Sequence, residues 1–292
     1  MANHRCTLLD DRGVLRIGGA DAREFLQGLI SNDVAALRPD RPLYAALLTP
    51  QGKYLFDFIL HDRGETLLLD CERSRAAALL QRLTLYRLRA AVSLDEVSDG
   101  HAVLAVFDHG PVPPGSIADP AAAVDPRLPE LGLRLILPRE RVPDFVAAHG
   151  LQPVDADEYD RLRLALGVPD GSRDLVLDRS LLLESGFEEL HGVSFTKGCF
   201  VGQELTARTK HRGLIKRRLL PVRVDGPLPA PGTPVTRGGK DAGEVRSGAG
   251  QLALALLRLE ALTAGDAPLL AGEAVLTPAP PPWLPMAALA RD

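Results

Sequence analysis

The strongest constraint on the fold is a change in secondary-structure pattern near residue 213. Beyond this point the chain is built from short apolar segments bounded by glycine or proline. The segments are 219–224, 233–236, 243–246, 252–259 and 273–276. Short strands joined by tight turns are typical of small closed sheets. The sequence therefore predicts a C-terminal β-barrel domain over residues 213–292.

The chain before residue 213 mixes helical and strand patterns. Two apolar runs, 43–48 and 54–60, flank the turn-forming segment Thr49–Lys53, which predicts a β-hairpin. Helical periodicity covers 21–29 and 155–166. Mixed elements followed by strands indicate the α+β class.

A segment rich in proline and alanine divides this first region. Residues 111–129 predict an exposed connection between two subdomains, with the division near 110–130. The expected organisation is therefore a two-subdomain region over 1–212 followed by the barrel domain over 213–292.

One segment, residues 192–208, has the features of a reactive site. Gly198 and Gly202 flank Cys199, and glycine allows a tight turn or a close approach to a ligand. The pattern predicts a helix over Gln203–His211, so the thiol lies just ahead of a helix N-terminus. The helix dipole and the nearby Lys197 both favour a thiolate. We therefore predict that Cys199 is a nucleophile or soft-metal ligand, assisted by Lys197.

Two plainer interpretations remain open at this stage. A lone cysteine is often a small, buried and inert residue. The segment from Lys197 to Arg218 is rich in lysine and arginine, with Glu204 as its single acid. It could bind the anionic tail of a ligand, an acidic partner or RNA, or it could be a solvated face. The scarcity of aromatic residues, 4% of the chain, argues against direct RNA binding.

Composition excludes several classes of protein. No apolar run is long enough to span a bilayer. The first residues lack a hydrophobic signal core and an amphipathic presequence, so we expect a cytoplasmic location. The three cysteines form no CxxC pair, which favours a reducing compartment. Because a metal centre normally needs several ligands and the chain offers one promising thiol, no stably bound metal is expected.

The motif Lys197–Glu204, KGCFVGQE, resembles the signature of the YgfZ family of folate-binding, glycine-cleavage T-protein-like proteins. Further segments resemble the same family: Phe25–Val34, Leu48–Lys53, Leu166–Pro169 and Leu182–Ser185. Leu205–Thr209 and Lys216–Leu219 make the chain look similar to the mitochondrial iron–sulfur assembly subgroup and its bacterial relatives.

The resemblance implies a fold and a function. The implied fold is the aminomethyltransferase (T-protein) fold, in which three subdomains surround a folate-accommodating channel and the last is a small β-barrel. The implied ligand is tetrahydrofolate. The implied role is the maturation or repair of [4Fe–4S] enzymes, with iron–sulfur assembly proteins or client enzymes as partners. A link to tRNA modification, described for some members, would then be indirect.

The resemblance also supplies candidate cofactor contacts, which are Tyr159, Asp33, Glu184, Gln203, Glu204 and Arg208. Tyr159 matches a position where some members carry a stacking tryptophan, and its ring could stack on a pterin. It could equally be an ordinary residue of an amphipathic helix. Asp33 and Asp57 are candidate channel acids or, alternatively, capping and turn residues.

Two departures separate the chain from the T-protein. The T-protein anchors the pterin with a glutamate, and the matching residue here is Ala165. The T-protein also carries an acid on the helix after its third strand, but Arg73–Leu94 contains no Asp or Glu. Proton handling at a folate nitrogen needs such an acid. The leading hypothesis is therefore a folate-binding accessory factor; the alternatives are an aminomethyltransferase-type enzyme and an RNA- or partner-binding protein linked to tRNA modification.

Overall fold

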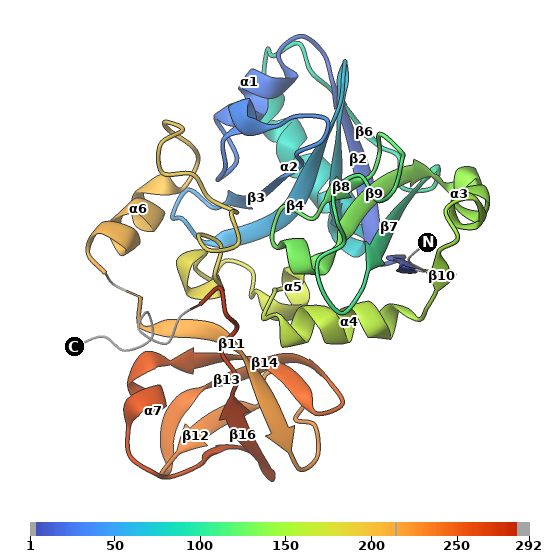
Figure 1. The fold of residues 1–292 in the computed structure, drawn as a ribbon. Coiled ribbons are helices and arrows are strands. Elements are labelled where there is room, and N and C mark those ends of the chain that lie inside the picture. The colour runs from blue at the N-terminus through green and yellow to red at the C-terminus, as the bar shows by residue number, and fades with distance from the viewer. Residues whose placement is uncertain (1–3, 214, 285–292) are drawn as a thin grey trace. The chain divides into compact units, whose positions relative to one another are not determined.

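The computed structural model describes residues 4–213 and 215–284, which form two compact units (Figure 1). Unit 1 comprises the chain up to Pro50, Leu55–Tyr159 and Leu190–Gln203. Unit 2 comprises Gln51–Tyr54, Asp160–Glu189 and the chain from Glu204 onward. Each unit therefore draws on separate parts of the sequence. The predicted division into 1–212 and 213–292 stays a proposal.

The first sheet of unit 1 has five strands in the order β3-β4-β5-β2-β6. Their bounds are Arg12–Gly18 (β2), Leu43–Leu48 (β3), Tyr54–Arg63 (β4), Thr66–Glu72 (β5) and Ser93–Glu96 (β6). β3 and β4 form the predicted hairpin around Thr49–Lys53. Gly52 in this turn has a φ of 76°, a conformation that favours glycine.

Two helices cover this sheet, α1 (Ala22–Gln27) and α2 (Ala76–Arg87). Leu26 of α1 and Leu79 and Leu83 of α2 are fully buried in one apolar cluster with the strands. Leu79 and Leu83 are spaced i, i+4, so they lie on the same face of the helix. Burial of such a stripe stabilises the helix against its sheet.

The second sheet of unit 1 has the order β10-β1-β7-β9-β8. Its strands are Arg5–Leu8 (β1), His101–Phe107 (β7), Ala123–Val124 (β8), Leu133–Pro138 (β9) and Gln152–Pro153 (β10). Helix α3 (Val142–Ala148) packs Phe145 into the apolar cluster of this sheet. Short 3₁₀ turns complete the unit at Val34–Ala36 (η1), Arg73–Arg75 (η2), Pro129–Leu131 (η3) and Arg139–Arg141 (η4).

The segment 111–129 corrects one prediction, because it is not simply an exposed connection. Val112, Ile117 and Leu128 are buried, and β8 joins the sheet beside β9. Asp125 and Arg127 are also buried, as a bidentate ion pair. Its proline and alanine content suggested a solvated linker, and Pro113–Ser116 are exposed, but its larger apolar side chains and the Asp125–Arg127 pair are buried.

The predicted barrel is closed in unit 2, in the order β11-β14-β13-β12-β15-β16. Its strands are Arg217–Asp225 (β11), Pro234–Arg237 (β12), Lys240–Ala249 (β13), Leu252–Arg258 (β14), Leu269–Ala271 (β15) and Ala274–Pro278 (β16). Gly243 has a φ of 146°, and a Cβ there would lie 2.1 Å from the Leu256 carbonyl oxygen. Glycine is therefore required where β13 approaches β14.

The other helical elements described beyond residue 155, apart from the motif helix discussed below, are three helices and one turn. They are α4 (Ala156–Ala165), α5 (Gly171–Asp174), α7 (Leu259–Thr263) and η5 (Leu183–Ser185).

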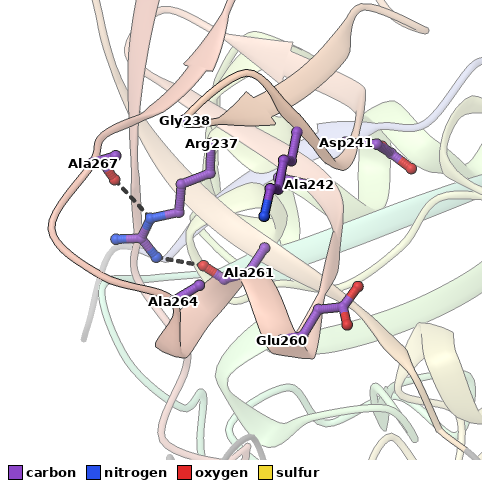
Figure 2. A pocket seen from close by; sticks show the side chains of 9 residues that line it. Arg237, Gly238, Asp241, Ala242, Glu260, Ala261, Ala264 and Ala267 are labelled. Carbon is purple, nitrogen blue, oxygen red and sulfur yellow. Dashed lines mark hydrogen bonds between the residues drawn. The ribbon is translucent and has the colours of Figure 1, made fainter.

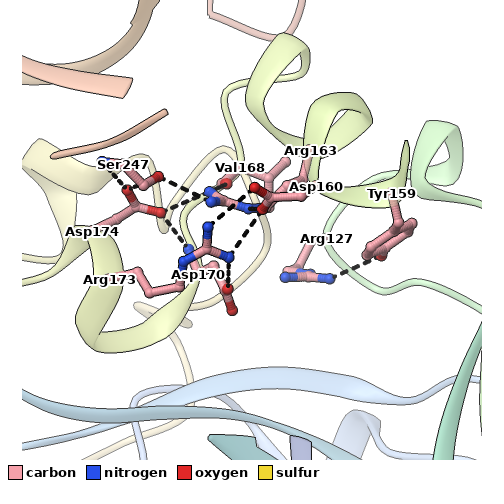
Figure 3. A network of polar contacts seen from close by, with 9 residues as sticks. All are labelled: Arg127, Tyr159, Asp160, Arg163, Val168, Asp170, Arg173, Asp174 and Ser247. Carbon is pink, nitrogen blue, oxygen red and sulfur yellow. Dashed lines mark hydrogen bonds and ion pairs between the residues drawn. The ribbon is translucent and has the colours of Figure 1, made fainter. Parts of the chain in front are cut away.

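A buried polar network joins α4, α5 and the barrel within unit 2 (Figure 3). Arg163 pairs with Asp160 at 2.6 Å and Asp174 at 2.7 Å, and donates to Ser247 Oγ at 2.9 Å. Ser247 lies on β13, so this network fixes the barrel to the helices.

A pocket of about 500 Å³ lies between the β12–β13 hairpin and α7 (Figure 2). Arg237 lines it, but its guanidinium donates to the carbonyl oxygens of Ala261 and Ala267. Asp241 at the rim pairs with Arg258. Arg237 therefore holds α7 and the loop that follows it.

No helix in the part of the chain that the structure describes is both long enough and apolar enough to cross a membrane.

Candidate functional site

The motif helix begins where the sequence predicts. Helix α6 spans Gln203–His211, and Gly202 ahead of it has a φ of 80°. Gln203 Oε1 accepts a hydrogen bond from the Phe200 backbone N–H at 3.2 Å. The glutamine thus turns back onto the preceding loop and fixes the approach of the Cys199 segment to the helix.

The loop before α6 is anchored to the segment that follows α1. Ser31 Oγ donates to the Gly192 carbonyl oxygen at 2.6 Å, and Ser194 N–H donates to the Ser31 carbonyl oxygen at 3.0 Å. Asn32 Nδ2 donates to the His191 carbonyl oxygen at 2.6 Å. Ser31 and Asn32 are buried. The fold therefore brings the segment 25–34 beside the loop that leads into the motif Lys197–Glu204, although the two are far apart in sequence.

Gln27 connects the two sides of this junction. Its Nε2 atom donates to Asp33 Oδ1 at 2.9 Å and to the Lys197 carbonyl oxygen at 3.3 Å. Its Oε1 atom accepts from the Val34 N–H at 2.8 Å. Asp33 also accepts from the Ala35 N–H as the cap of η1. Asp33 is thus occupied by local hydrogen bonds, and its contact with a ligand stays a prediction.

Lys197 reaches the carboxyl end of α1 with its ammonium group. Nζ donates to the carbonyl oxygens of Gln27 and Ile30, each at 2.6 Å, and lies 5.2 Å from the centre of the Phe200 ring. Burial lowers the pKa of Lys197 to about 8, although the Asp33 carboxylate opposes the shift. These contacts give Lys197 an anchoring role. Its assistance to Cys199 in catalysis stays a prediction.

Cys199 differs from the other two cysteines in its exposure. Its side chain is exposed, whereas Cys6 and Cys71 are buried. Burial raises the pKa of the Cys6 thiol to about 11 and that of Cys71 to about 12. The buried thiols are therefore apolar core residues, and Cys199 is open to reagents and partners.

Tyr159 lies in the interior of unit 1. Its ring meets Phe107 edge-on at 5.2 Å between centroids. Its hydroxyl lies 3.5 Å from both Arg127 Nη2 and Asp125 Oδ2, and Figure 3 shows the first of these contacts. Burial raises the pKa of Tyr159, and the Asp125 carboxylate adds to the shift. The hydroxyl therefore stays protonated and positions the ion pair beside it. Stacking of its ring on a pterin stays a prediction.

A second set of buried charged residues links the two sheets of unit 1. Asp70 on β5 accepts from Arg12 Nε on β2 and from Arg134 Nε on β9, each at 2.7 Å. Burial by itself raises the pKa of Asp70, but the two guanidinium groups outweigh it and hold the pKa below its usual value. His61 is buried nearby, and burial lowers its pKa to about 3. We call Tyr159, Asp125, Arg127, Asp70, Arg12, Arg134 and His61 the interior polar network.

Asp57 lies in unit 1, whereas Glu184, Glu204 and Arg208 lie in unit 2, so the predicted set is divided between the units. Glu184 is half-buried, and burial raises its pKa while Arg217 and Lys53 oppose the shift. Glu204 and Arg208 are exposed on α6. Ala165 is exposed at the end of α4, so the residue matching the pterin-binding glutamate of the T-protein offers no carboxylate.

Part of the basic segment is neutralised by ion pairs. Lys210 pairs with Glu188, and the buried Arg218 pairs with Glu189 at 2.7 Å. Arg208 and Arg212 are exposed. The segment is thus partly a structural surface, as one of its two interpretations proposed.

Sequence reasoning missed the interior polar network apart from Tyr159. Asp125 and Arg127 flank one proline, and Arg127 N–H donates to Asp125 Oδ1 at 3.1 Å. Asp often accepts a hydrogen bond from the backbone N–H two residues later. The Asp-Pro-Arg run in an otherwise apolar segment could therefore have indicated this pairing. No comparable local signal marks Asp70, because both its partners are distant in sequence.

Among the side chains that the structure describes, no three His, Cys, Asp or Glu residues converge in a way that could hold a metal ion.

Comparison with known proteins supports this organisation. A family model described as the C-terminal β-barrel domain of CAF17 matches residues 216–286. The crystal structure of the glycine cleavage system aminomethyltransferase T from Bartonella henselae superposes with a TM-score of 0.73, covering 96% of this chain and 85% of that chain at 16% identity. The predicted T-protein-like α+β fold with a C-terminal small β-barrel is confirmed.

Curated relatives carry one name. The mitochondrial iron–sulfur cluster assembly factor IBA57 of Mus musculus is 37% identical, over 97% of this chain and 86% of its own length. The Homo sapiens protein of the same name is 39% identical, over 86% of this chain and 77% of its own length. Because these relatives are named as mitochondrial proteins, the prediction of a cytoplasmic location is wrong.

The relatives also decide the predicted family. Identity above 30% extends over most of both chains. The resemblance read from the motif is thereby confirmed. The chain belongs to the family of the iron–sulfur cluster assembly factor IBA57, a branch of the YgfZ family.

Proposed function

We propose that this chain is a folate-binding accessory protein for the maturation or repair of [4Fe–4S] enzymes, and that Cys199 performs its thiol chemistry. The observation that carries the proposal is the exposed Cys199 thiol on an anchored loop. Family membership supports the iron–sulfur role, because the relatives are named as iron–sulfur cluster assembly factors.

The surroundings of Cys199 suit a transient soft-metal contact. Lys197 and Gln27 hold the loop, so the thiol can be presented without reordering the backbone. The start of α6 follows four residues later, so the thiol lies just ahead of a helix N-terminus. One thiol cannot hold a cluster alone. A cluster in transit would therefore be shared between Cys199 and ligands of an assembly protein or client enzyme.

The donor groups of unit 1 fit a folate. A pterin ring needs carboxylate or carbonyl acceptors, polar donors and a flat apolar surface. The interior polar network offers Asp125 and Tyr159, and His61 Nε2 is buried without a hydrogen-bond partner in the described chain. We propose that these residues hold tetrahydrofolate, which would supply one-carbon or redox chemistry. Because Ala165 lacks the T-protein carboxylate, the binding mode would differ from that of the T-protein.

The alternative functions have less support. Helix α2 follows β5 and contains no acid at any position, so the proton-handling carboxylate of an aminomethyltransferase is missing there. The basic segment is partly paired with Glu188 and Glu189, which weakens the case for an RNA surface. An effect on tRNA modification would then arise through a [4Fe–4S] client enzyme.

Replacing Cys199 with serine is expected to abolish complementation. In a strain lacking this protein, the activity of a [4Fe–4S] enzyme such as aconitase should fall at least about tenfold relative to wild-type rescue, because serine is a poor soft-metal ligand. The matched control is Cys199→Ser/Ser116→Cys, which moves an exposed thiol to another loop of unit 1 and should not rescue. Full rescue by Cys199→Ser would remove the thiol from the proposal.

Folate binding has a separate test. Anaerobic calorimetry with tetrahydrofolate should show binding that weakens about three- to tenfold in Tyr159→Phe, the effect of one lost hydrogen bond. Tyr86→Phe, on α2, is the matched control and should bind like wild type. If wild type shows no binding at millimolar tetrahydrofolate, the folate part of the proposal fails while the thiol part stands.

A further inference from the structure

The carboxyl end of α2 and the two residues after it combine exposed leucines with arginines that make no ion pair within the described residues. Leu85 is 66% exposed and Leu88, which follows the helix, is 88% exposed. Arg82 and Arg87 on α2 and Arg89 beyond it are exposed, and within the described residues none makes a hydrogen bond or an ion pair. We call these five residues the α2 face. It is separate from the Cys199 loop and from the interior polar network.

Folding does not explain leucine at position 88. Its backbone has a φ of 45° and a ψ of −107°, a strained conformation for a side chain with a Cβ. Glycine is the usual residue where a helix ends with a positive φ. The side chain also gains no burial that would offset the strain. Leu88 therefore lowers the stability of the isolated chain, and a contact with another molecule would offset this loss.

The charge of the α2 face selects the kind of partner. The whole chain has a net charge of −4, yet Arg73–Leu94 contains no acid. Arg73 pairs with Asp99 and Arg75 lies over the Phe56 ring, so Arg82, Arg87 and Arg89 remain to meet external charge. Complementarity of this sort steers association and selects acidic surfaces.

We infer that the α2 face docks an acidic amphipathic helix of a partner protein. Leu85 and Leu88 supply the apolar part of this surface, and the exposed arginines next to them in the sequence supply its positive charge. An apolar centre with arginine around it is typical of protein interfaces. RNA would need exposed aromatic rings for stacking. A membrane surface would need a longer apolar stripe. This inference goes beyond the proposed function and does not depend on folate or on Cys199.

The test uses the full chain and two synthetic helical peptides of about 18 residues, long enough to form a helix. Both carry a leucine stripe; one is flanked by glutamate and its twin by lysine. Fluorescence anisotropy should show binding of the glutamate peptide alone, with weakening at higher salt. Arg82→Glu/Arg87→Glu should weaken it at least about tenfold, because charge is reversed at the rim. Arg161→Glu, an exposed arginine of α4, should bind like wild type.

Leu88→Gly is a second variant, which tests the same surface without reversing any charge. It should raise the melting temperature by about 1–3 °C, because it relieves the backbone strain, and still weaken peptide binding. Equal binding of both peptides, or of neither at millimolar concentration, overturns the inference. Binding of tRNA or of phosphatidylserine vesicles, lost in Arg82→Glu/Arg87→Glu while neither peptide binds, also overturns it and assigns the face to those ligands.

Discussion

Asp70→Asn is expected to lower the free energy of unfolding by about 3–5 kcal/mol, the cost of leaving buried charges without their partner. Asp70 is fully buried and accepts hydrogen bonds from both Arg12 and Arg134 at 2.7 Å. The amide removes the negative charge that two buried guanidinium groups share. Urea denaturation at neutral pH measures the loss. Because the pKa of Asp70 is lowered by folding, its stabilisation is present above the ordinary carboxyl pKa and is lost in more acidic solution.

Two controls separate this effect from a general loss of charge. Asp95→Asn breaks the exposed Arg16–Asp95 pair of the same sheet and should cost below about 1 kcal/mol. The triple change Arg12→Met/Asp70→Leu/Arg134→Met removes all three charges and should recover most of the stability. A loss below about 1 kcal/mol in Asp70→Asn would contradict the assignment of this carboxylate as the link between the two sheets.

Asp174→Asn is expected to have a comparable effect on unit 2, about 3–5 kcal/mol. The buried Asp174 carboxylate accepts from Arg163 Nη1 at 2.7 Å and from Ser247 Oγ at 2.6 Å (Figure 3). It also accepts from the N–H groups of Asp170 and Ser247. An asparagine amide would present N–H groups to some of these donors. The barrel would then lose its attachment to α4 and α5, which limited proteolysis and thermal unfolding can detect.

The matched change is Asp241→Asn on the outside of the same barrel. Asp241 also pairs with an arginine, Arg258, but its side chain is 61% exposed. Solvent screening makes such pairs weak, so the loss should stay below about 1 kcal/mol. Equal losses in Asp174→Asn and Asp241→Asn would mean that burial of the Arg163 network contributes nothing special to unit 2.

Local patterns predicted several elements correctly. The helix after Gly202 begins and ends at the predicted residues, 203 and 211, and the Thr49–Lys53 turn joins β3 to β4. Five of the six barrel strands were anticipated, and the missed one, β15, has three residues. Turn residues and apolar periodicity act over a few positions, so such elements are encoded locally.

The candidate site was predicted less completely than the fold. The exposed Cys199 and its loop were marked by the motif, but the carbonyl anchors of Lys197 lie at the end of α1 and just beyond it, about 170 residues earlier in the chain. The bidentate Asp125–Arg127 pair was hidden in a segment whose composition indicated a linker. A charged residue in a sequence gives no sign of whether folding will bury it.

The sequence by itself determined the class of elements, the barrel, the motif helix and, through the motif, the family. Tertiary structure alone decided which distant residues meet: Asp70 with Arg134 across two sheets, Lys197 with the end of α1, and Arg163 with Ser247. The physical reason is that periodicity and turn chemistry depend on neighbouring residues, whereas burial of a charge is tolerated only where the fold supplies its partner.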